Sequence, residues 1–254
     1  MEPSSQQEQS AAGRAALPAA PPRVARRRAA AGRKPTLSVP VIVAAAIEVL
    51  DETGFAGLTM RRVADRLGTG AASLYAHVSG REELLELVFD ALVGQVKLED
   101  PDPARWREQV HRLLRDLRDI LASHTDAALA GLGRVPTAPQ TLAAAEVLTG
   151  VLRAGGLSDR VVALGFDQLV LYVSASAFEA GLYRKADPAE IERYFAGVHS
   201  FYASLPPGRY PVLAAIAPDM TGADGDERFE FGLNVLIAGL EAASAADKAG
   251  RQRG

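Results

Sequence analysis

The side chains best suited to chemistry gather between residues 58 and 81. Ala64, Gly68 and Leu74 have the spacing of a helix-turn-helix, in which a small residue lies where two helices cross, a glycine makes the turn and an apolar residue holds the second helix. With Leu74 facing inward, the outward side chains are Arg61, Arg62, Arg66, Ser73, Tyr75 and His77. Such donors suit phosphates and base edges, so the pattern predicts a surface that contacts DNA.

Other chemistries find no support in the sequence. The absence of cysteine excludes disulfides, thiolate zinc sites, iron-sulfur clusters and a cysteine nucleophile. The four histidines share no metal-ligand spacing, and no G-x-S-x-G motif occurs. The run from Gly68 to Ser73 resembles a dinucleotide loop only superficially, because it follows a predicted helix and lacks the final glycine. We therefore predict no catalytic site, no metal site and no cofactor.

Four predicted helices hold the motif in place. The first runs from about Ser38 to Gly54, and the second is capped by Thr59 and ended by Gly68. The third, over 70–77, is too short to be stable alone. Ser79 and Glu82 have capping-box spacing and predict a fourth helix, which joins two apolar bodies.

The rest of the chain also has helical sequence patterns, so the predicted fold class is all-α. Helices are expected over about 106–122, 139–154, 158–183, 188–204 and 227–245, with 205–225 as a long connection. The predicted organisation is a disordered basic Ala/Pro-rich tail (1–36), a three-helix helix-turn-helix DNA-binding domain (37–83), a larger helical ligand-binding and dimerisation domain (84–246), and a frayed tail (247–254).

Two of these helices are apolar on nearly every face. Residues 168–178 carry no formal charge, and the last helix places Leu233 and Ile237 on one side and Phe231 and Val235 on nearly the other. Such helices must be buried all round. Pairing with a second copy satisfies this, and so does a central place in one large domain. We favour a homodimer formed through the helices around 160–182 and 227–245.

The net charge of −3 is unevenly distributed. Residues 1–34 carry seven Lys/Arg against two Glu (net +5), residues 35–81 carry four against four (net 0), and residues 82–254 carry 17 against 25 (net −8). The basic runs Arg26 to Arg28 and Arg33-Lys34 could add phosphate or minor-groove contacts. No apolar run approaches membrane length and no secretory signal pattern occurs, so the expected location is the cytoplasm, without a membrane partner.

The segment Leu74-Tyr75-Ala76-His77-Val78, with the residues before it and Ser79 to Leu85 after it, resembles the DNA-binding domain of the tetracycline-repressor (TetR) family of transcriptional regulators. The resemblance covers roughly residues 38–245. It implies DNA contacts at Thr59, Arg61, Ala71, Ala72, Ser73, Tyr75, His77 and Arg81. Arg61 is the candidate for a bidentate guanine contact, with phosphate binding as the alternative. Ala71 and Ala72 depart from the namesake repressor, so its operator sequence cannot be transferred.

The same resemblance implies a ligand pocket. The positions that match the drug and magnesium contacts of the namesake are Leu113, Leu117, Gly131, Arg134, Val135 and Val147. Leucine, glycine and valine cannot supply the polar partners of a metal-bound tetracycline, so the effector is expected to be more apolar or simply different. For each of these residues, ordinary helix packing remains the alternative.

The predicted function is a homodimeric, sequence-specific DNA-binding transcriptional regulator, a repressor released from a near-palindromic double-stranded DNA operator by an unknown small-molecule effector. Two alternatives remain. An architectural DNA-binding protein would show little operator preference and no ligand response, whereas a helical small-molecule enzyme would turn its ligand over and ignore DNA.

Overall fold

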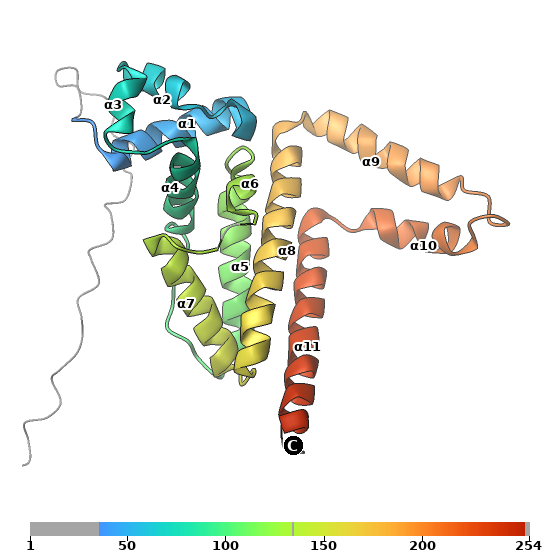
Figure 1. The fold of residues 1–254 in the computed structure, drawn as a ribbon. Coiled ribbons are helices and arrows are strands. Elements are labelled where there is room, and N and C mark those ends of the chain that lie inside the picture. The colour runs from blue at the N-terminus through green and yellow to red at the C-terminus, as the bar shows by residue number, and fades with distance from the viewer. Residues whose placement is uncertain (1–35, 134, 252–254) are drawn as a thin grey trace, which may run out of the picture. The chain divides into compact units, whose positions relative to one another are not determined.

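The computed structural model describes residues 36–133 and 135–251, and all regular secondary structure in them is helical (Figure 1). The all-α prediction is therefore confirmed for this part of the chain. The predicted basic tail, with Arg26 to Arg28 and Arg33-Lys34, lies outside the described residues. The helix-turn-helix motif lies within a head of four helices: α1 (Val39–Gly57), α2 (Met60–Leu67), α3 (Ala71–Tyr75) and α4 (Arg81–Val93).

The turn between α2 and α3 forms as the sequence predicts. The Thr59 side chain accepts a hydrogen bond from the Arg62 backbone N–H at 3.3 Å, which satisfies one free donor of the first turn of α2. Gly68 ends α2 with φ 63°, a left-handed conformation that glycine adopts without steric cost. At Gly54 (φ 73°) the backbone leaves helical geometry as predicted, although one more turn follows as far as Gly57.

The predicted capping box of α4 is wrong by one residue. The helix begins at Arg81, and the backbone N–H of Ser79 donates to the Glu83 carboxylate at 2.5 Å. Gly80, with extended backbone, separates Ser79 from the helix and shifts the spacing by one. Hydrogen bonds from the side chain and the backbone of Ser79 lower the pKa of Glu83.

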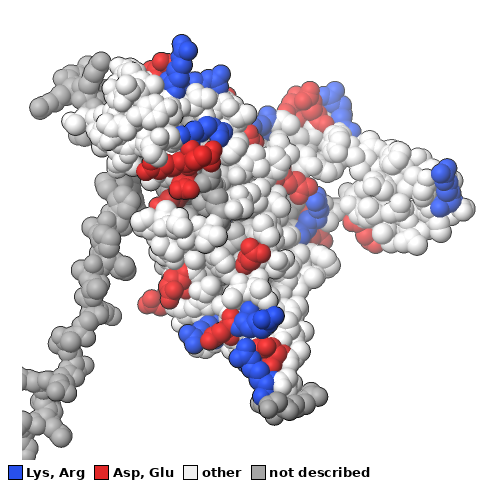
Figure 2. Space-filling view, viewed as in Figure 1, with Lys and Arg blue, Asp and Glu red and all other residues white. Residues whose placement is uncertain are grey.

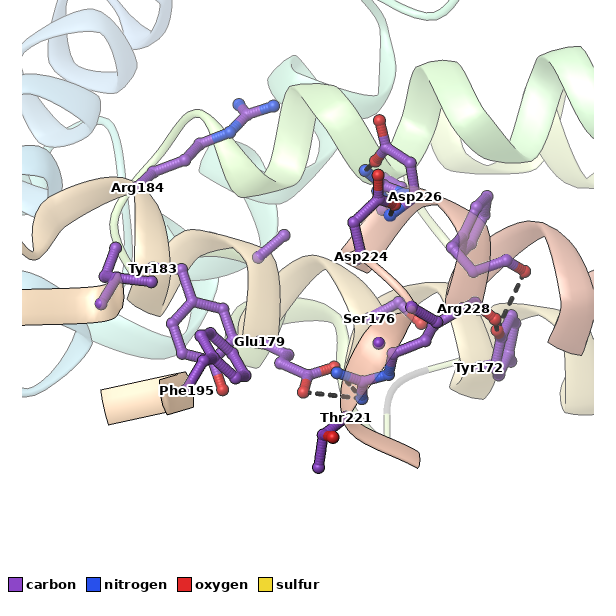
Figure 3. Close-up of a pocket in the computed structure, with 17 residues that line it drawn as sticks. Tyr172, Ser176, Glu179, Tyr183, Arg184, Phe195, Thr221, Asp224, Asp226 and Arg228 are labelled. Atoms are coloured by element: carbon purple, nitrogen blue, oxygen red, sulfur yellow. Dashed lines mark hydrogen bonds and ion pairs between the residues drawn. The ribbon is translucent and has the colours of Figure 1, made fainter. Parts of the chain in front are cut away.

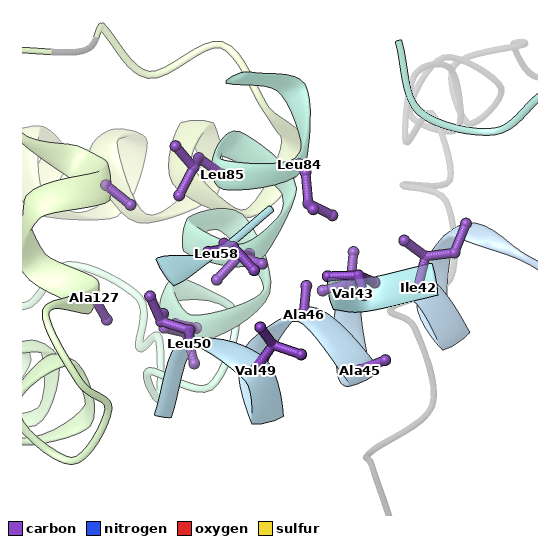
Figure 4. Packing of buried hydrophobic residues seen from close by; sticks show 14 of the residues in the cluster. Ile42, Val43, Ala45, Ala46, Val49, Leu50, Leu58, Leu84, Leu85 and Ala127 are labelled. Atoms are coloured by element: carbon purple, nitrogen blue, oxygen red, sulfur yellow. The ribbon is translucent and has the colours of Figure 1, made fainter. Parts of the chain in front are cut away.

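The head has its own core, and α4 continues that core into the rest of the molecule. Side chains of α1 pack against Leu58, Leu84 and Leu85, all fully buried (Figure 4). The same cluster includes Ala127 and Ala177, from helices far along the chain. The head is therefore packed directly against the following helices.

The remaining helices form the body and a protruding pair. They are α5 (Trp106–Ala122), α6 (Ala127–Gly131), α7 (Pro139–Ala154), α8 (Asp159–Lys185), α9 (Pro188–Ala203), α10 (Pro211–Gly222) and α11 (Gly225–Arg251). A second core joins α5, α7, α8 and α11 through residues such as Leu114, Leu152, Leu169 and Leu233. The long helices α8 and α11 lie side by side, and the hairpin of α9 and α10 extends away from them (Figure 1).

Three features of the body differ from the predictions. The expected connection over 205–225 contains α10, which begins at Pro211 and tolerates Pro218 inside it. The five-residue α6 was not predicted, because it is too short to show a periodic pattern. The last helix continues to Arg251, so the predicted frayed tail is wrong for 247–251. Ser244 accepts a hydrogen bond from the Ser158 N–H at 2.8 Å, and Lys248 contacts the Gly156 carbonyl, which anchors the end of α11 to the turn before α8.

Candidate nucleic-acid interface and ligand cavity

The structure exposes the predicted donors of α3 and of the turn that follows it. Leu74 is fully buried and fixes α3 against the head core. Ser73, Tyr75 and His77 are exposed, and Tyr75 retains 55% of its accessible surface despite its size. Ala72 is exposed beside them, whereas Ala71 is half-buried and packs against the core. An aromatic ring, a hydroxyl and an imidazole are thus presented outward on a rigid support.

The three arginines of α2 differ in their partners, which the sequence did not indicate. Arg62 donates to the Gly57 carbonyl at 2.9 Å. Arg66 donates to Glu48 at 2.9 Å and contacts Glu52, and these hydrogen bonds raise the pKa of its guanidinium. Figure 2 shows basic and acidic atoms side by side over the head. Arg61 is exposed and has no hydrogen-bonding or ion-pair partner within the described residues, so it is the arginine of α2 that remains available to DNA.

Two predicted DNA contacts have structural partners. The Thr59 oxygen already caps α2. The Arg81 guanidinium donates to the Leu58 carbonyl at 2.9 Å and to the Phe55 carbonyl at 2.7 Å, and lies 4.8 Å from the centre of the Phe55 ring. Arg81 therefore links the start of α4 to the last turn of α1 and to Leu58 after it, and its contact with DNA stays a prediction.

A mainly apolar cavity of about 300 Å³ lies between the head helix α4 and the body. Among the residues predicted to bind ligand, Leu113, Leu117, Gly131 and Val135 line it. Val147 is not among the lining residues and packs against the body core, while its neighbour Leu148 faces the cavity. Arg134 lies outside the described residues.

Further lining residues could not be identified from the sequence alone. They come from α4, α7 and α8, whose positions around the cavity depend on tertiary packing: Glu86, Phe89, Val93, Thr141, Ala144, Ala145, Phe166, Asp167 and Val170. A Cβ atom added at Gly131 would lie 2.3 Å from Cζ of Phe89, so the end of α6 is pressed directly against α4 at the cavity wall.

A second cavity, of about 740 Å³, lies where α9 leaves the body (Figure 3). Its charged side chains largely pair with one another, as Arg228 donates to Glu179 at 2.9 Å and Arg118 contacts Asp226. Burial raises the pKa of Tyr172 and of Tyr183 in its wall. The described residues contain no group of three or more acidic or histidine side chains placed to hold a metal ion.

Comparisons with known proteins agree with this geometry. Residues 42–88 match the family described as bacterial regulatory proteins, tetR family, and residues 100–244 match the tetracyclin repressor-like C-terminal domain. An HTH-type transcriptional regulator of Saccharopolyspora erythraea is 33% identical over 217 residues, which cover 84% of this chain and 89% of the relative. The HTH-type transcriptional repressor DrrR1 of Streptomyces coeruleorubidus is 32% identical over 219 residues, covering 83% and 79%.

Among solved structures, ActR of Streptomyces coelicolor in complex with actinorhodin is 40% identical to this chain, with a TM-score of 0.74, and the match covers 82% of this chain and 97% of ActR. The N-terminal segment and the C-terminal segment of the chain therefore both match the same family of regulators. The chain belongs to the TetR family of bacterial transcriptional regulators.

Proposed function

We propose that this regulator is a homodimeric repressor that places α3 of each subunit in a major groove and leaves its operator when a small molecule fills the cavity beside α4. The observation that carries the proposal is that Ser73 and Tyr75 of α3 and His77 just after it are all exposed, while the buried Leu74 fixes α3. Arg61, which has no partner within the described residues, adds an exposed charged donor on the neighbouring helix α2.

The dimer is supported by apolar side chains on α8 and α11 that a single chain leaves exposed. They lie 7 and 11 residues apart on α8 and four residues apart on α11, at spacings that return to the same face of a helix: Leu164, Leu171, Leu182, Phe231 and Val235. The opposite faces of both helices are buried in the body core. By length and composition alone α8 and α11 could also cross a membrane. Pairing of these two helices with their copies buries the exposed row and agrees with their packing against the rest of the body.

The operator is expected to be near-palindromic. A two-fold dimer presents two copies of α3, so it binds half-sites about one helical turn (~34 Å) apart. We expect the protein to act in the cytoplasm, where it meets chromosomal DNA.

The cavity between α4, α5, α7 and α8 is our candidate effector site. Its volume of about 300 Å³ and its mainly apolar wall suit a small molecule with an extended apolar surface. In the larger cavity, by contrast, four of the charged side chains form two pairs, Arg228 with Glu179 and Arg118 with Asp226. Because ActR, 40% identical, has been crystallised with actinorhodin, actinorhodin is a suitable first probe of this cavity. Release follows when the probe binds the DNA-free arrangement of the heads more tightly than the DNA-bound one.

The test is recovery of genomic fragments on immobilised protein, with and without actinorhodin, followed by affinity measurements on the recovered fragment at fixed salt. We expect enrichment of a near-palindromic sequence and its release by the probe. Arg153→Ala, which removes an exposed charge at the end of α7, outside the motif and the helices proposed to form the dimer, serves as the matched control for Arg61→Ala.

Unselective recovery of fragments with no ligand response would favour an architectural protein. Turnover of the ligand without DNA binding would favour an enzyme. Either result contradicts the proposed function.

A further inference from the structure

Asp90 connects the helix that enters the head with the helix that forms a wall of the candidate effector site. The residue is only 9% exposed, and its Oδ1 accepts hydrogen bonds from the backbone N–H of Gln140 at 2.9 Å and of Thr141 at 2.8 Å. Because α7 begins at Pro139, these are first-turn N–H groups, which have no partner within the helix itself. The positive end of the α7 dipole also favours a carboxylate at this place.

The helix that carries Asp90 belongs to both parts of the molecule. Leu84 and Leu85 of α4 are fully buried in the head core. Phe89 and Val93 of the same helix line the candidate effector site. A displacement of α4 relative to α7 therefore changes the position of the head and the shape of the cavity together.

The first turn of α7 is itself part of the cavity wall. Ala138 and Thr141 line the cavity, and the N–H of Thr141 is one of the two donors to Asp90. The Thr141 hydroxyl donates to the Ala138 carbonyl at 2.9 Å, which makes this turn one hydrogen-bonded unit with Asp90. A molecule that displaces this wall must therefore either pull the two N–H donors away from Asp90 or move α4 together with the first turn of α7.

The charge of Asp90 makes this contact selective for one arrangement. A buried carboxylate is costly unless hydrogen-bonded, and within the described residues no lysine or arginine forms an ion pair with Asp90. Apolar side chains would hold α4 and α7 together over a range of offsets, whereas two directional, charge-assisted bonds are satisfied at one offset only. If α4 and α7 slide past each other, both hydrogen bonds break and the charge of Asp90 is left without its partners.

We propose that Asp90 is the positioning residue through which occupation of the cavity sets the position of the head. The inference rests on the proposed function, because it names the contact by which that function is regulated. In this view the two bonds to the α7 terminus hold the DNA-binding arrangement, and a ligand that displaces the first turn of α7 releases α4 from it.

The chain contains no cysteine, so two introduced cysteines can be labelled uniquely. We would place spin labels at Ala56 in the head and Glu146 on α7, both exposed, and dilute labelled chains with unlabelled protein. Distance distributions between the labels are then compared for the parent protein, Asp90→Ala, Asp90→Asn and Asp187→Ala. Asp187 is the matched control, since its carboxylate caps α9 by accepting from Ala189 N–H at 3.0 Å, away from α4.

Asp90→Ala should broaden the head-to-α7 distance distribution about twofold, because a charged cap is lost from the contact. Asp90→Asn keeps an acceptor oxygen, so the width of its distance distribution should lie between those of Asp90→Ala and the parent. If Asp90→Ala fails to fold, Asp90→Asn still tests the inference. Asp187→Ala should leave the distribution unchanged. An unchanged distribution in both folded Asp90 variants, or equal broadening by Asp187→Ala, would overturn the inference.

The second readout is the ratio of operator affinities without and with saturating actinorhodin, which a purely stabilising role of Asp90 would not change. We expect Asp90→Ala to reduce this ratio about fivefold or more, the usual scale of coupling between two sites. A parent protein that actinorhodin fails to release would count against the proposed effector. The distance measurements, which need no effector, would still decide the role of Asp90.

Discussion

At the scale of single residues, the head shows how similar side chains take different roles. Arg61, Arg62 and Arg66 lie within six residues of one another in the sequence, yet Arg62 and Arg66 are held by partners in the protein and Arg61 is not, within the described residues. Arg81 is likewise occupied by the Phe55 and Leu58 carbonyls. The fold, and not the residue type, decides which of these arginines are held by partners within the protein.

Arg61→Ala should weaken operator binding by about 1 to 3 kcal/mol and relax the preference at one base position, since a bidentate guanine contact contributes this much. Titration of the operator and its single-base variants at fixed salt would measure the loss. An equal loss on every sequence would assign Arg61 to a phosphate, and an unchanged affinity would contradict any contact with DNA.

Arg81→Ala should lower the free energy of unfolding by about 2 to 3 kcal/mol, because two carbonyls lose a charged donor. Arg81→Lys should rescue it only in part, since an ammonium cannot reproduce the planar fork of a guanidinium. Urea unfolding of both variants, with Arg61→Ala as the control of unchanged stability, would check this. Full stability together with lost operator binding would show that Arg81 acts as a DNA contact and not as a support of the fold.

At the scale of helices, the short helix α6 contacts both the core of the head and the wall of the cavity. The five-residue α6 contributes Ala127 and Ala128 to the head core and ends at Gly131 on the cavity wall. Its end lies so close to α4 that position 131 has no room for a side chain unless Phe89 moves. The size of the cavity is thus set by helix packing on its head side.

Gly131→Ala should push the Phe89 ring into the cavity and weaken ligand binding there, because the added Cβ would lie 2.3 Å from Cζ. Calorimetric titration with actinorhodin would measure the loss. Gly197→Ala is the control, as Gly197 lies within α9 with open space around it, and alanine there should stabilise the helix by about 0.5 to 1 kcal/mol. Unaltered ligand affinity in Gly131→Ala would place the ligand elsewhere.

The start of α11 should give a pH-dependent contribution to stability. A hydrogen bond from the Arg118 guanidinium lowers the pKa of Asp226. A carboxyl with a lowered folded-state pKa stabilises the fold above its ordinary value of about 3.9, and this contribution is lost as pH falls from there through the lowered value.

The difference in unfolding free energy between the parent and Asp226→Asn should therefore be largest near neutral pH and shrink as the medium is acidified below about pH 4. Denaturant unfolding of both proteins across this range is the measurement. A difference that grows toward low pH would show that the sign is wrong.

At the scale of the whole molecule, exposed apolar surface indicates assembly. The rows on α8 and α11 leave Leu171 at 43% and Phe231 at 71% of their full exposure in a single chain. The hairpin of α9 and α10 adds further exposed apolar side chains, such as Phe201, Val212 and Ile216, and Figure 2 shows an uncharged area between the charged groups near its ends.

Leu171→Glu and Phe231→Glu should each convert the dimer to a monomer, because the proposed interface would bury an unpaired carboxylate. The molecular mass measured by light scattering should fall from about twice the chain mass of 26.8 kDa to the mass of one chain. Operator affinity should fall as well, because a monomer presents only one copy of α3. Leu142→Glu, at an exposed leucine of α7, is the control that should leave the mass unchanged. A parent protein that scatters as a monomer at micromolar concentration would refute the dimer.

The sequence by itself determined what depends on neighbours along the chain. Thr59 and Gly68 delimit α2, and apolar periodicity predicts the helices, because caps and helix faces are set by residues within a few positions of one another. The helix-turn-helix spacing is also set by nearby residues, and so is the inward orientation of Leu74.

Only the tertiary structure decided which groups remain free and where cavities form. Arg66 meets Glu48 and Arg81 meets Phe55 across a fold that brings distant residues together, so their occupation leaves no local pattern. The same holds for Asp90, whose partners lie 50 and 51 residues away. A cavity exists where helices fail to fill the space between them, and that depends on the packing of all its walls at once.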